Sequence, residues 1–184
     1  MLCEKIIGRI EDSEFIGKPV DFVEIDWHET YNKILRKTSK SGRDVAIRLG
    51  DDILKIGMKP GDVLGIDSDG TVLAVEVPAT DVLVVTVEES SAFNFAKVGY
   101  EIGNCHAPLF AGEADNQFVT IFNEPMEHLL SHLHHVKVER KVQKLNFAKQ
   151  ISTIVGHGHS HGEHHHHEYY SELLWILVFL SFYN

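Results

Sequence analysis

Residues 81–110 read DVLVVTVEESSAFNFAKVGYEIGNCHAPLF, and this stretch decides the fold. It opens on a near-continuous apolar run, which predicts a buried strand. Behind the serines at 90 and 91, apolar residues recur at helical spacing, and Gly103 with Asn104 would end that helix. The letters CHAPLFA, residues 105–111, predict a second strand. The stretch therefore predicts a strand, a helix and a strand, with His106 directly after the helix end.

The pattern continues through the next thirty residues. Residues 116–122, NQFVTIF, predict a strand, and residues 124–135, EPMEHLLSHLHH, predict a helix with Pro125 in its first turn. Residues 136–143, VKVERKVQ, alternate apolar and charged side chains, as a strand does. The resulting order, β-α-β-β-α-β, is that of a ferredoxin-like domain. We assign it to residues 78–147.

The chain before this unit has a different pattern. Short β-branched runs alternate with turn sequences such as SKSGRD, MKPGD and SDG, which predicts a small all-β unit over residues 1–77 with no helix of useful length. Pro78 marks the boundary, because proline interrupts strand pairing. The predicted class is α+β, with an N-terminal β domain, a ferredoxin-like domain and a flexible His-rich tail over residues 148–184 that has an apolar C-terminal end.

The tail holds the densest chemical signal in the chain. Residues 155–170 read VGHGHSHGEHHHHEYY and carry seven of the thirteen histidines. Neutral imidazole suits nickel, copper and zinc, and a Gly- and His-rich segment can wrap an ion without a preformed cavity. A solvated low-complexity tail or an engineered tag are the alternatives. The candidate ligands here are His157, His159, His161, His164, His165, His166 and His167.

The apolar run near the C-terminus is shorter than a membrane span. A transmembrane helix needs roughly 20 apolar residues, whereas the unbroken run covers residues 173–180. Packing against the body of the protein, contact with a partner and interfacial anchoring all stay open for the segment Leu173 to Tyr183. No transmembrane segment is expected.

Composition excludes several classes of function. The formal net charge of −10, with scattered Lys and Arg, leaves no basic stripe for nucleic acid. The two cysteines, Cys3 and Cys105, form no disulfide or zinc-finger pattern, and the N-terminus lacks a secretory signal, so a cytoplasmic location is expected. Phosphate-loop, nucleophile-elbow and zinc-protease motifs are absent from the sequence, which favours a protein that is not an enzyme.

Other histidines have weaker signals. A lone histidine such as His106 is more often structural, and as a ligand it would need a partner, which the symmetry of a C2 dimer can supply from the second copy. His128, His132 and His135 fall on one side of the second predicted helix, where they could chelate an ion or simply form a solvated face. His28 reads as an ordinary surface histidine.

The segment YEIGNCHAPLF, the KPGDVL turn, the β-α-β-β-α-β order and the His-rich tail together resemble the UreE family of urease accessory proteins, which are nickel metallochaperones. The most specific element is EIGNxH, whose histidine is the family's metal ligand at the dimer interface; here it is His106. Cys105 stands where the family usually has arginine, and we favour a bystander role for it. The family's additional histidines before the second helix have no counterpart in VTIFNEP.

The resemblance implies a cytosolic homodimer that binds Ni(II) through His106 of both subunits, with His157, His159 and His161 first among the tail ligands. It implies delivery to the urease accessory GTPase and the apo-urease complex, with protein contacts made by the N-terminal β unit. Zn(II) and Cu(II) suit the same ligands. The alternatives are a metal storage or detoxification protein without a client, and an adaptor whose histidines only affect solubility.

Overall fold

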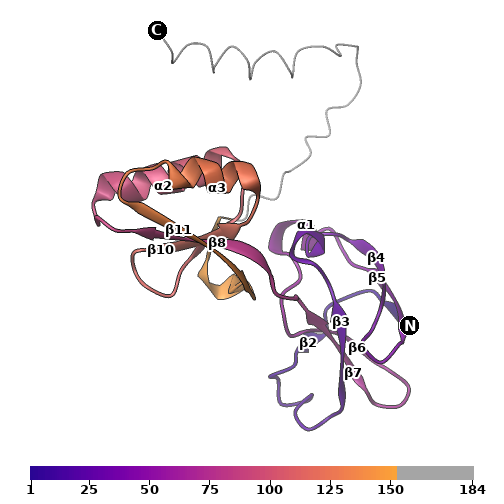
Figure 1. Cartoon of the computed structure of the whole chain (residues 1–184). Helices are drawn as coiled ribbons and strands as arrows, with labels where there is room; N and C mark the ends of the chain where they lie inside the picture. The colour runs from indigo at the N-terminus through magenta and orange to yellow at the C-terminus, as the bar shows by residue number, and fades with distance from the viewer. Residues whose placement is uncertain (153–184) are drawn as a thin grey trace, which may run out of the picture.

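The N-terminal part of the chain forms two small sheets (Figure 1). The computed structural model describes residues 1–152, so the predicted tail histidines and the apolar end lie outside the described residues. One sheet has the order β1 (Leu2–Cys3), β5 (Asp44–Arg48) and β4 (Ile34–Thr38). The other has the order β2 (Gly8–Arg9), β6 (Asp62–Ile66), β7 (Val72–Glu76) and β3 (Val20–Glu24). The predicted sheet-rich character is confirmed.

Two short helical pieces interrupt these strands. They are the 3₁₀ turn η1 (Trp27–Glu29) and the single-turn helix α1 (Ile53–Ile56). Gly57 ends α1 with a φ of 64°, and a Cβ at that position would lie 3.0 Å from the Tyr31 ring. Glycine is therefore required there both by backbone conformation and by space.

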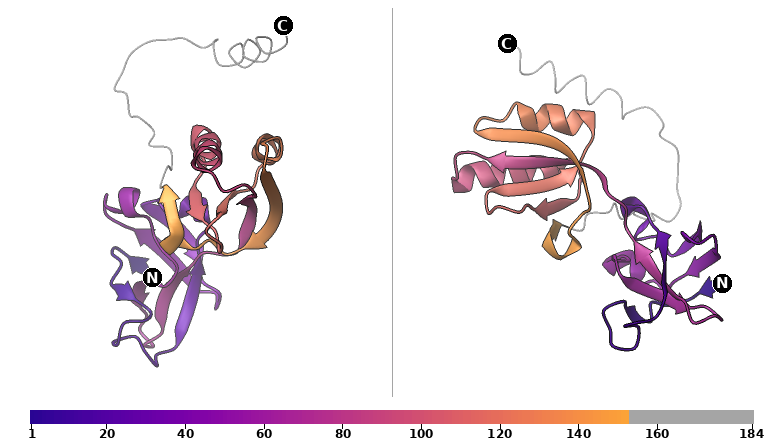
Figure 2. Two further views of the ribbon diagram at one scale, coloured as in Figure 1. Left: turned by 90° about the vertical axis from the view of Figure 1, so that its left-hand side faces the viewer. Right: turned by 60° about the horizontal axis from the view of Figure 1, so that its bottom comes forward.

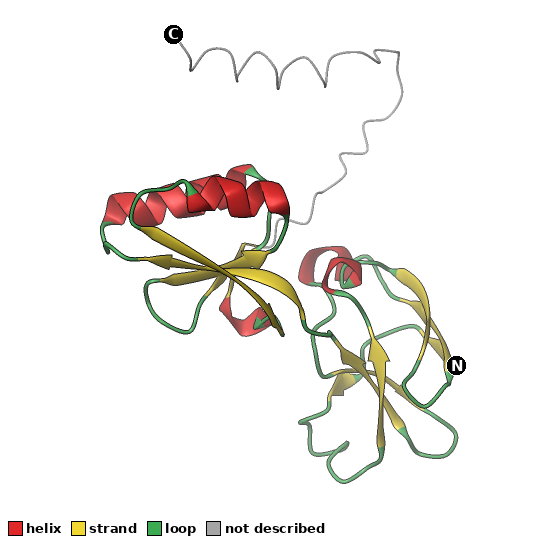
Figure 3. Ribbon diagram, viewed as in Figure 1, coloured by secondary structure: helices red, strands yellow, loops and turns green. Residues whose placement is uncertain are grey.

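The second part of the chain combines helices with one antiparallel sheet, as Figures 2 and 3 show. Its elements follow in the order β8 (Thr80–Val87), α2 (Ala92–Asn104), β9 (Leu109–Ala111), β10 (Gln117–Ile121), α3 (Glu124–Ser131) and β11 (Val136–Gln143). After the 3₁₀ turn η2 (Phe147–Lys149), a further strand β12 (Gln150–Ser152) pairs with β9. The sheet order is β11-β8-β10-β9-β12.

The predicted extent of the second helix is wrong at its C-terminal end. We expected a helix through His135, but α3 ends at Ser131. The amide groups of His132 and Leu133 donate to the carbonyl oxygens three residues earlier, which tightens the last turn, and His135 has a φ of 60° that no α-helix accommodates. Only His128 of the histidines in this region belongs to the helix.

Strand β8 explains the near-continuous apolar run in the sequence. Leu83, Val85 and Val87 pack in the core beneath α2 and α3, whereas Val82 and Val84 pack on the opposite face of the sheet. A central strand with both faces buried has no solvent-facing positions, so the usual alternation disappears. The helices cover one face of the sheet (Figures 1 and 2), and each is fixed there by fully buried side chains: Val98 and Ile102 from α2, Met126 and Leu130 from α3.

Two aromatic side chains connect the two parts of the molecule. Trp27 and Phe147 are each half-buried against both the N-terminal core and the cluster on the second face of the C-terminal sheet. Phe147 also makes an edge-to-face contact with Phe110, with ring centroids 6.0 Å apart. An ion pair between Lys144 and Glu76, with 2.8 Å between Nζ and Oε1, lies across the same junction.

Candidate metal centre

Helix α2 is fixed at both ends, and this determines where His106 lies. At its start, the Ser91 side chain accepts a hydrogen bond from the amide of Asn94 at 3.2 Å, a typical N-cap. Along its length, Val98 and Ile102 are fully buried, and Phe95 makes an edge-to-face contact with Phe118. The helix can therefore neither shift nor rotate without disrupting the core beneath it.

The C-terminal end of α2 is a Schellman motif with histidine in place of the usual glycine. The His106 amide donates to the Gly103 carbonyl oxygen at 2.9 Å, and the Ala107 amide donates to that of Ile102 at 3.3 Å. These two bonds define the motif, whose left-handed residue is His106 with a φ of 53°. This conformation costs a non-glycine residue about 1–2 kcal/mol. His106 is one of two non-glycine residues with a positive φ in the described part of the chain, the other being His135.

The same motif separates a buried anchor from an exposed imidazole. Ala107 is 8% exposed and packs with Ile102 in the core, whereas His106 and the neighbouring Cys105 are both exposed. The backbone on either side of the imidazole is thus rigidly placed, and the ring projects into solvent. Such a ring can ligate an ion through a lone pair without any rearrangement of the core.

One protomer alone does not enclose an ion at this point. Among residues 1–152, no three His, Cys, Asp or Glu side chains lie close enough together to hold a metal. Cys105 is a free exposed thiol beside His106, but adjacent side chains diverge from the backbone. A centre at His106 therefore needs ligands from the tail or from a second protomer, and the tail histidines lie outside the described residues.

The outer face of α2 leads towards His106 and has two exposed aromatic side chains beside polar residues such as Lys97. Phe93 is 73% exposed and Tyr100 is 68% exposed, and both lie opposite the buried stripe of the helix. Ala96 is exposed between them, and open space surrounds the position of a Cβ at Gly103. Two exposed aromatic rings with small residues beside them are typical of a protein contact surface. The spacing of Phe93 and Tyr100 in the sequence is compatible with one helix face, but it carries no signal for their exposure.

The remaining histidines lie apart from His106 along the chain and make other contacts. His128 and His132 lie at the end of α3 with ring centroids 4.2 Å apart. His135 has left the helix and its Nε2 lies 3.1 Å from Oε2 of Glu89. His28 is exposed and lies edge-on to Trp27, as expected for a surface histidine. The predicted grouping of His128, His132 and His135 therefore reduces to a pair.

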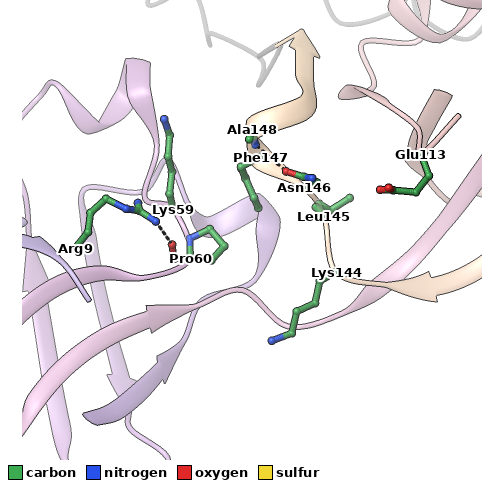
Figure 4. Close-up of a pocket in the computed structure, with 9 residues that line it drawn as sticks. All are labelled: Arg9, Lys59, Pro60, Glu113, Lys144, Leu145, Asn146, Phe147 and Ala148. Carbon is green, nitrogen blue, oxygen red and sulfur yellow. Dashed lines mark hydrogen bonds between the residues drawn. The ribbon is translucent and has the colours of Figure 1, made fainter. Parts of the chain in front are cut away.

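A cleft of about 620 Å³ lies between the two parts of the molecule, and the sequence analysis missed it (Figure 4). Its charged lining residues are Arg9, Lys59, Lys144 and Glu113, and its apolar ones are Pro60, Leu145, Phe147 and Ala148, beside Asn146. Arg9 is held by hydrogen bonds to the Pro60 carbonyl oxygen and to Asp62, both at 2.9 Å. The cleft offers cationic side chains, one carboxylate and apolar surface but no imidazole or thiol, which does not suit a borderline metal ion.

Comparison with known proteins identifies the family. Residues 3–78 match the N-terminal domain of the UreE urease accessory protein, and residues 80–169 match its C-terminal domain. The urease accessory protein UreE of Helicobacter pylori strain Shi470 is 38% identical over 133 residues, which cover 72% of this chain and 76% of the relative. UreE of Acetivibrio thermocellus is 36% identical over 126 residues, 68% of this chain and 77% of the relative.

A third relative, the UreE of Helicobacter acinonychis, is 36% identical over 133 residues, again covering 72% of this chain and 76% of the relative. Within residues 1–152, no helix is long and apolar enough to cross a membrane. Both halves of the chain thus match the two domains of one family, in the same order. The chain belongs to the UreE family of urease accessory proteins.

Proposed function

We propose that this chain is a homodimeric nickel metallochaperone that captures Ni(II) and delivers it for assembly of the urease active site. The observation that carries the proposal is the exposed imidazole of His106. Its backbone has a left-handed conformation at the end of α2, between the buried residues Ile102 and Ala107. Family membership supports a role in urease maturation, and it supports an accessory role rather than a catalytic one.

The proposed centre forms where two protomers meet. In a C2 dimer each residue near the axis faces its own copy, so two His106 rings can share one ion. The exposed aromatic face of α2, with Phe93 and Tyr100, supplies apolar surface for that contact. His157, His159 and His161 of the tail complete the coordination, and the four histidines at 164–167 hold further ions nearby. An incompletely closed site suits an ion that has to be passed on.

The two parts of the chain have separate tasks in this proposal. We take residues 1–77 as the unit that contacts partners, namely the urease accessory GTPase and apo-urease, and residues 78–147 as the ferredoxin-like unit for metal binding and dimerisation. The antiparallel order β11-β8-β10-β9 with both helices on one face supports the ferredoxin-like assignment. The free thiols Cys3 and Cys105 suit a reducing cytoplasm.

The ligands alone do not select nickel. Imidazole sites follow the Irving–Williams order, so Cu(II) binds at least as tightly as Ni(II), and Zn(II) also binds. Selectivity then comes from the availability of each metal and from the partners that accept it.

Calorimetric titration of the full-length protein with Ni(II) tests the proposal, and light scattering follows in parallel whether the protein is a monomer or a dimer. We compare the unaltered chain, His106→Ala, a variant with the seven tail histidines replaced by Ala, and His28→Ala as the matched exposed-histidine control. The expected result is that the tail variant keeps the one ion per dimer that His106→Ala removes, and that His28→Ala changes nothing. If His106→Ala binds as the unaltered chain does while the tail variant binds no nickel, the tail is a storage segment and the proposal fails.

A further inference from the structure

The C-terminal end of helix α3 holds a pair of imidazoles that the proposed function does not use. The helix itself is well fixed: the Asn123 side chain accepts a hydrogen bond from the Met126 amide at 2.8 Å, and Met126 and Leu130 are buried. His128 lies within the helix, and His132 follows its last residue with a φ of −90° and a ψ of −3°, still in the right-handed region. The spacing of four residues therefore places both rings on one exposed side of α3.

The two rings are already close to each other. Their centroids lie 4.2 Å apart, and their planes are inclined by 40°. Two nitrogen ligands in adjacent positions around a metal, each about 2.1 Å from it, lie roughly 3 Å apart. Because both side chains are exposed, a small rotation of the His128 ring opens this space without moving any core residue.

A hydrogen bond determines which nitrogen of His132 is available. His132 Nδ1 lies 2.7 Å from the backbone carbonyl oxygen of His128. A carbonyl oxygen only accepts, so Nδ1 carries the proton and donates it, and in the neutral ring Nε2 then has the free lone pair. Metal-ligating histidines commonly have this arrangement, in which the second ring nitrogen donates to a backbone carbonyl and orients the ring.

Capping of the helix accounts for only part of this arrangement. A histidine near a helix C-terminus often donates to one of the last carbonyl oxygens, as His132 does here. Capping leaves His132 Nε2 free, however, and among the described residues the nitrogens of the His128 ring have no hydrogen-bond or ion-pair partner either. The negative end of the helix dipole also favours a cation beside the last turn.

Neighbouring histidines do not share this geometry. His134 and His135 lie beyond the helix with ring centroids 6.5 Å apart. His135 has a φ of 60°, and its Nε2 lies beside the Glu89 carboxylate. Only the pair on α3 presents two imidazoles at chelating distance within the part of the chain that the structure describes.

We propose that His128 and His132 form a second, solvent-open binding site on each protomer for one borderline divalent cation, with water as the remaining ligands. His132 binds through Nε2, and His128 supplies the second nitrogen. Two imidazoles place Cu(II) first in affinity, ahead of Ni(II) and Zn(II), by the Irving–Williams order. The site goes beyond the proposed function, since it requires neither a second protomer nor His106.

The test uses full-length protein from which the other candidate ligands have been removed. In a background with His106 and the seven tail histidines replaced by Ala, Cu(II) and Ni(II) are titrated calorimetrically into the parent and into His128→Gln, His132→Gln and His134→Gln. The expected result is one ion per protomer in the parent, at least tenfold weaker binding in His128→Gln and in His132→Gln, and unchanged binding in His134→Gln. Failure of the His106 centre does not affect this outcome, because the background lacks that centre.

Two features of the design separate ligation from helix stability. His128→Gln keeps the His132 hydrogen bond to the backbone carbonyl, so an unchanged circular dichroism spectrum and melting temperature with weakened binding identify a lost ligand. In the unaltered chain, added Cu(II) should broaden the imidazole NMR signals of His128 and His132 together, and before those of His28. The proposal is overturned if the parent background binds no ion, if His134→Gln weakens binding as much as His128→Gln, or if the two α3 signals broaden no earlier than that of His28.

Discussion

Replacing His106 by glycine should stabilise the fold while removing nickel from the proposed centre. The side chain is exposed, and its left-handed φ of 53° is the conformation that a Schellman motif gives to glycine. Relief of the strain contributes about 1–2 kcal/mol, and the larger conformational entropy of glycine in the unfolded chain offsets roughly 0.5–1 kcal/mol of it. The expected net gain in the free energy of unfolding is about 0.5–1 kcal/mol.

Urea denaturation and thermal melting of the metal-free protein measure this gain. For a chain of 184 residues whose two parts unfold together, 1 kcal/mol corresponds to roughly 2–4 °C in melting temperature. His106→Ala provides the comparison, since it also removes the imidazole but keeps the strained backbone, so its stability should stay within about 0.5 kcal/mol of the unaltered chain. Both variants should lose the nickel ion that the His106 pair holds.

A matched control exists in the same domain. His135 is the other non-glycine residue of the described chain with a positive φ, at 60°. His135→Gly should relieve similar strain, less the small contribution of its exposed contact with the Glu89 carboxylate, and should leave the interfacial nickel ion in place. A lower stability of His106→Gly than of His106→Ala would refute the reasoning, because it would show that the left-handed conformation carries no strain at this position.

Three further perturbations test other parts of the structure. Burial alone would raise the pKa of Asp21, but hydrogen bonds from Ser39, Ser41 and Arg43 outweigh it and lower the pKa to about 2. The carboxylate should therefore contribute about 2 kcal/mol of stability above pH 4, and this contribution is lost as the pH falls towards 2. An Asp21→Asn variant whose acid unfolding curve matched the parent's would contradict this. Phe147→Ala, which removes the aromatic contact shared by both domains, should cost about 2 kcal/mol and split the calorimetric unfolding peak into two, whereas one unshifted peak would count against a coupling role. Phe93→Glu should yield a folded monomer by light scattering, because the ring is 73% exposed in the single chain; a persistent dimer would exclude this face of α2 from the interface.

The regular elements of the C-terminal unit could be predicted from periodicity, and so could the end of α2 at Asn104, whereas the end of α3 could not. The central strand β8 and the helix α2 are dictated by apolar spacing and by a serine cap, both local properties of the sequence. The end of α3 depends instead on the tightened turn after Leu130 and on the positive φ of His135, at a position with no glycine to signal it. The strand β12 depends on its partner β9, some forty residues earlier in the sequence, so no local pattern reveals it.

The same distinction applies to the candidate sites. The position of His106 after a helix end was readable from EIGN, whereas its left-handed conformation was not, because glycine is the residue that normally indicates a Schellman motif. The pair at His128 and His132 was visible as a spacing of four, but only the structure shows the hydrogen bond that frees Nε2. The cleft joins Arg9, Lys59 and Lys144 from distant parts of the chain, so it had no sequence signal at all.

The rigid placement of His106 has a thermodynamic consequence for the proposed dimer. Because Ile102 and Ala107 anchor the helix end in the core, the ring of one protomer cannot move far to meet its ion, and the second ring has to arrive with the second protomer. An ion held by both rings binds the dimer more tightly than the monomer, which offers only one of them, so it stabilises association by mass action, by up to about 2.7 kcal/mol when its free concentration is 100 times its dissociation constant. Linkage then acts in both directions: nickel promotes dimerisation, and a partner that separates the protomers weakens the nickel site at the same time. In the proposed dimer, a client that separates the protomers would therefore release the ion without any change within the fold of either protomer.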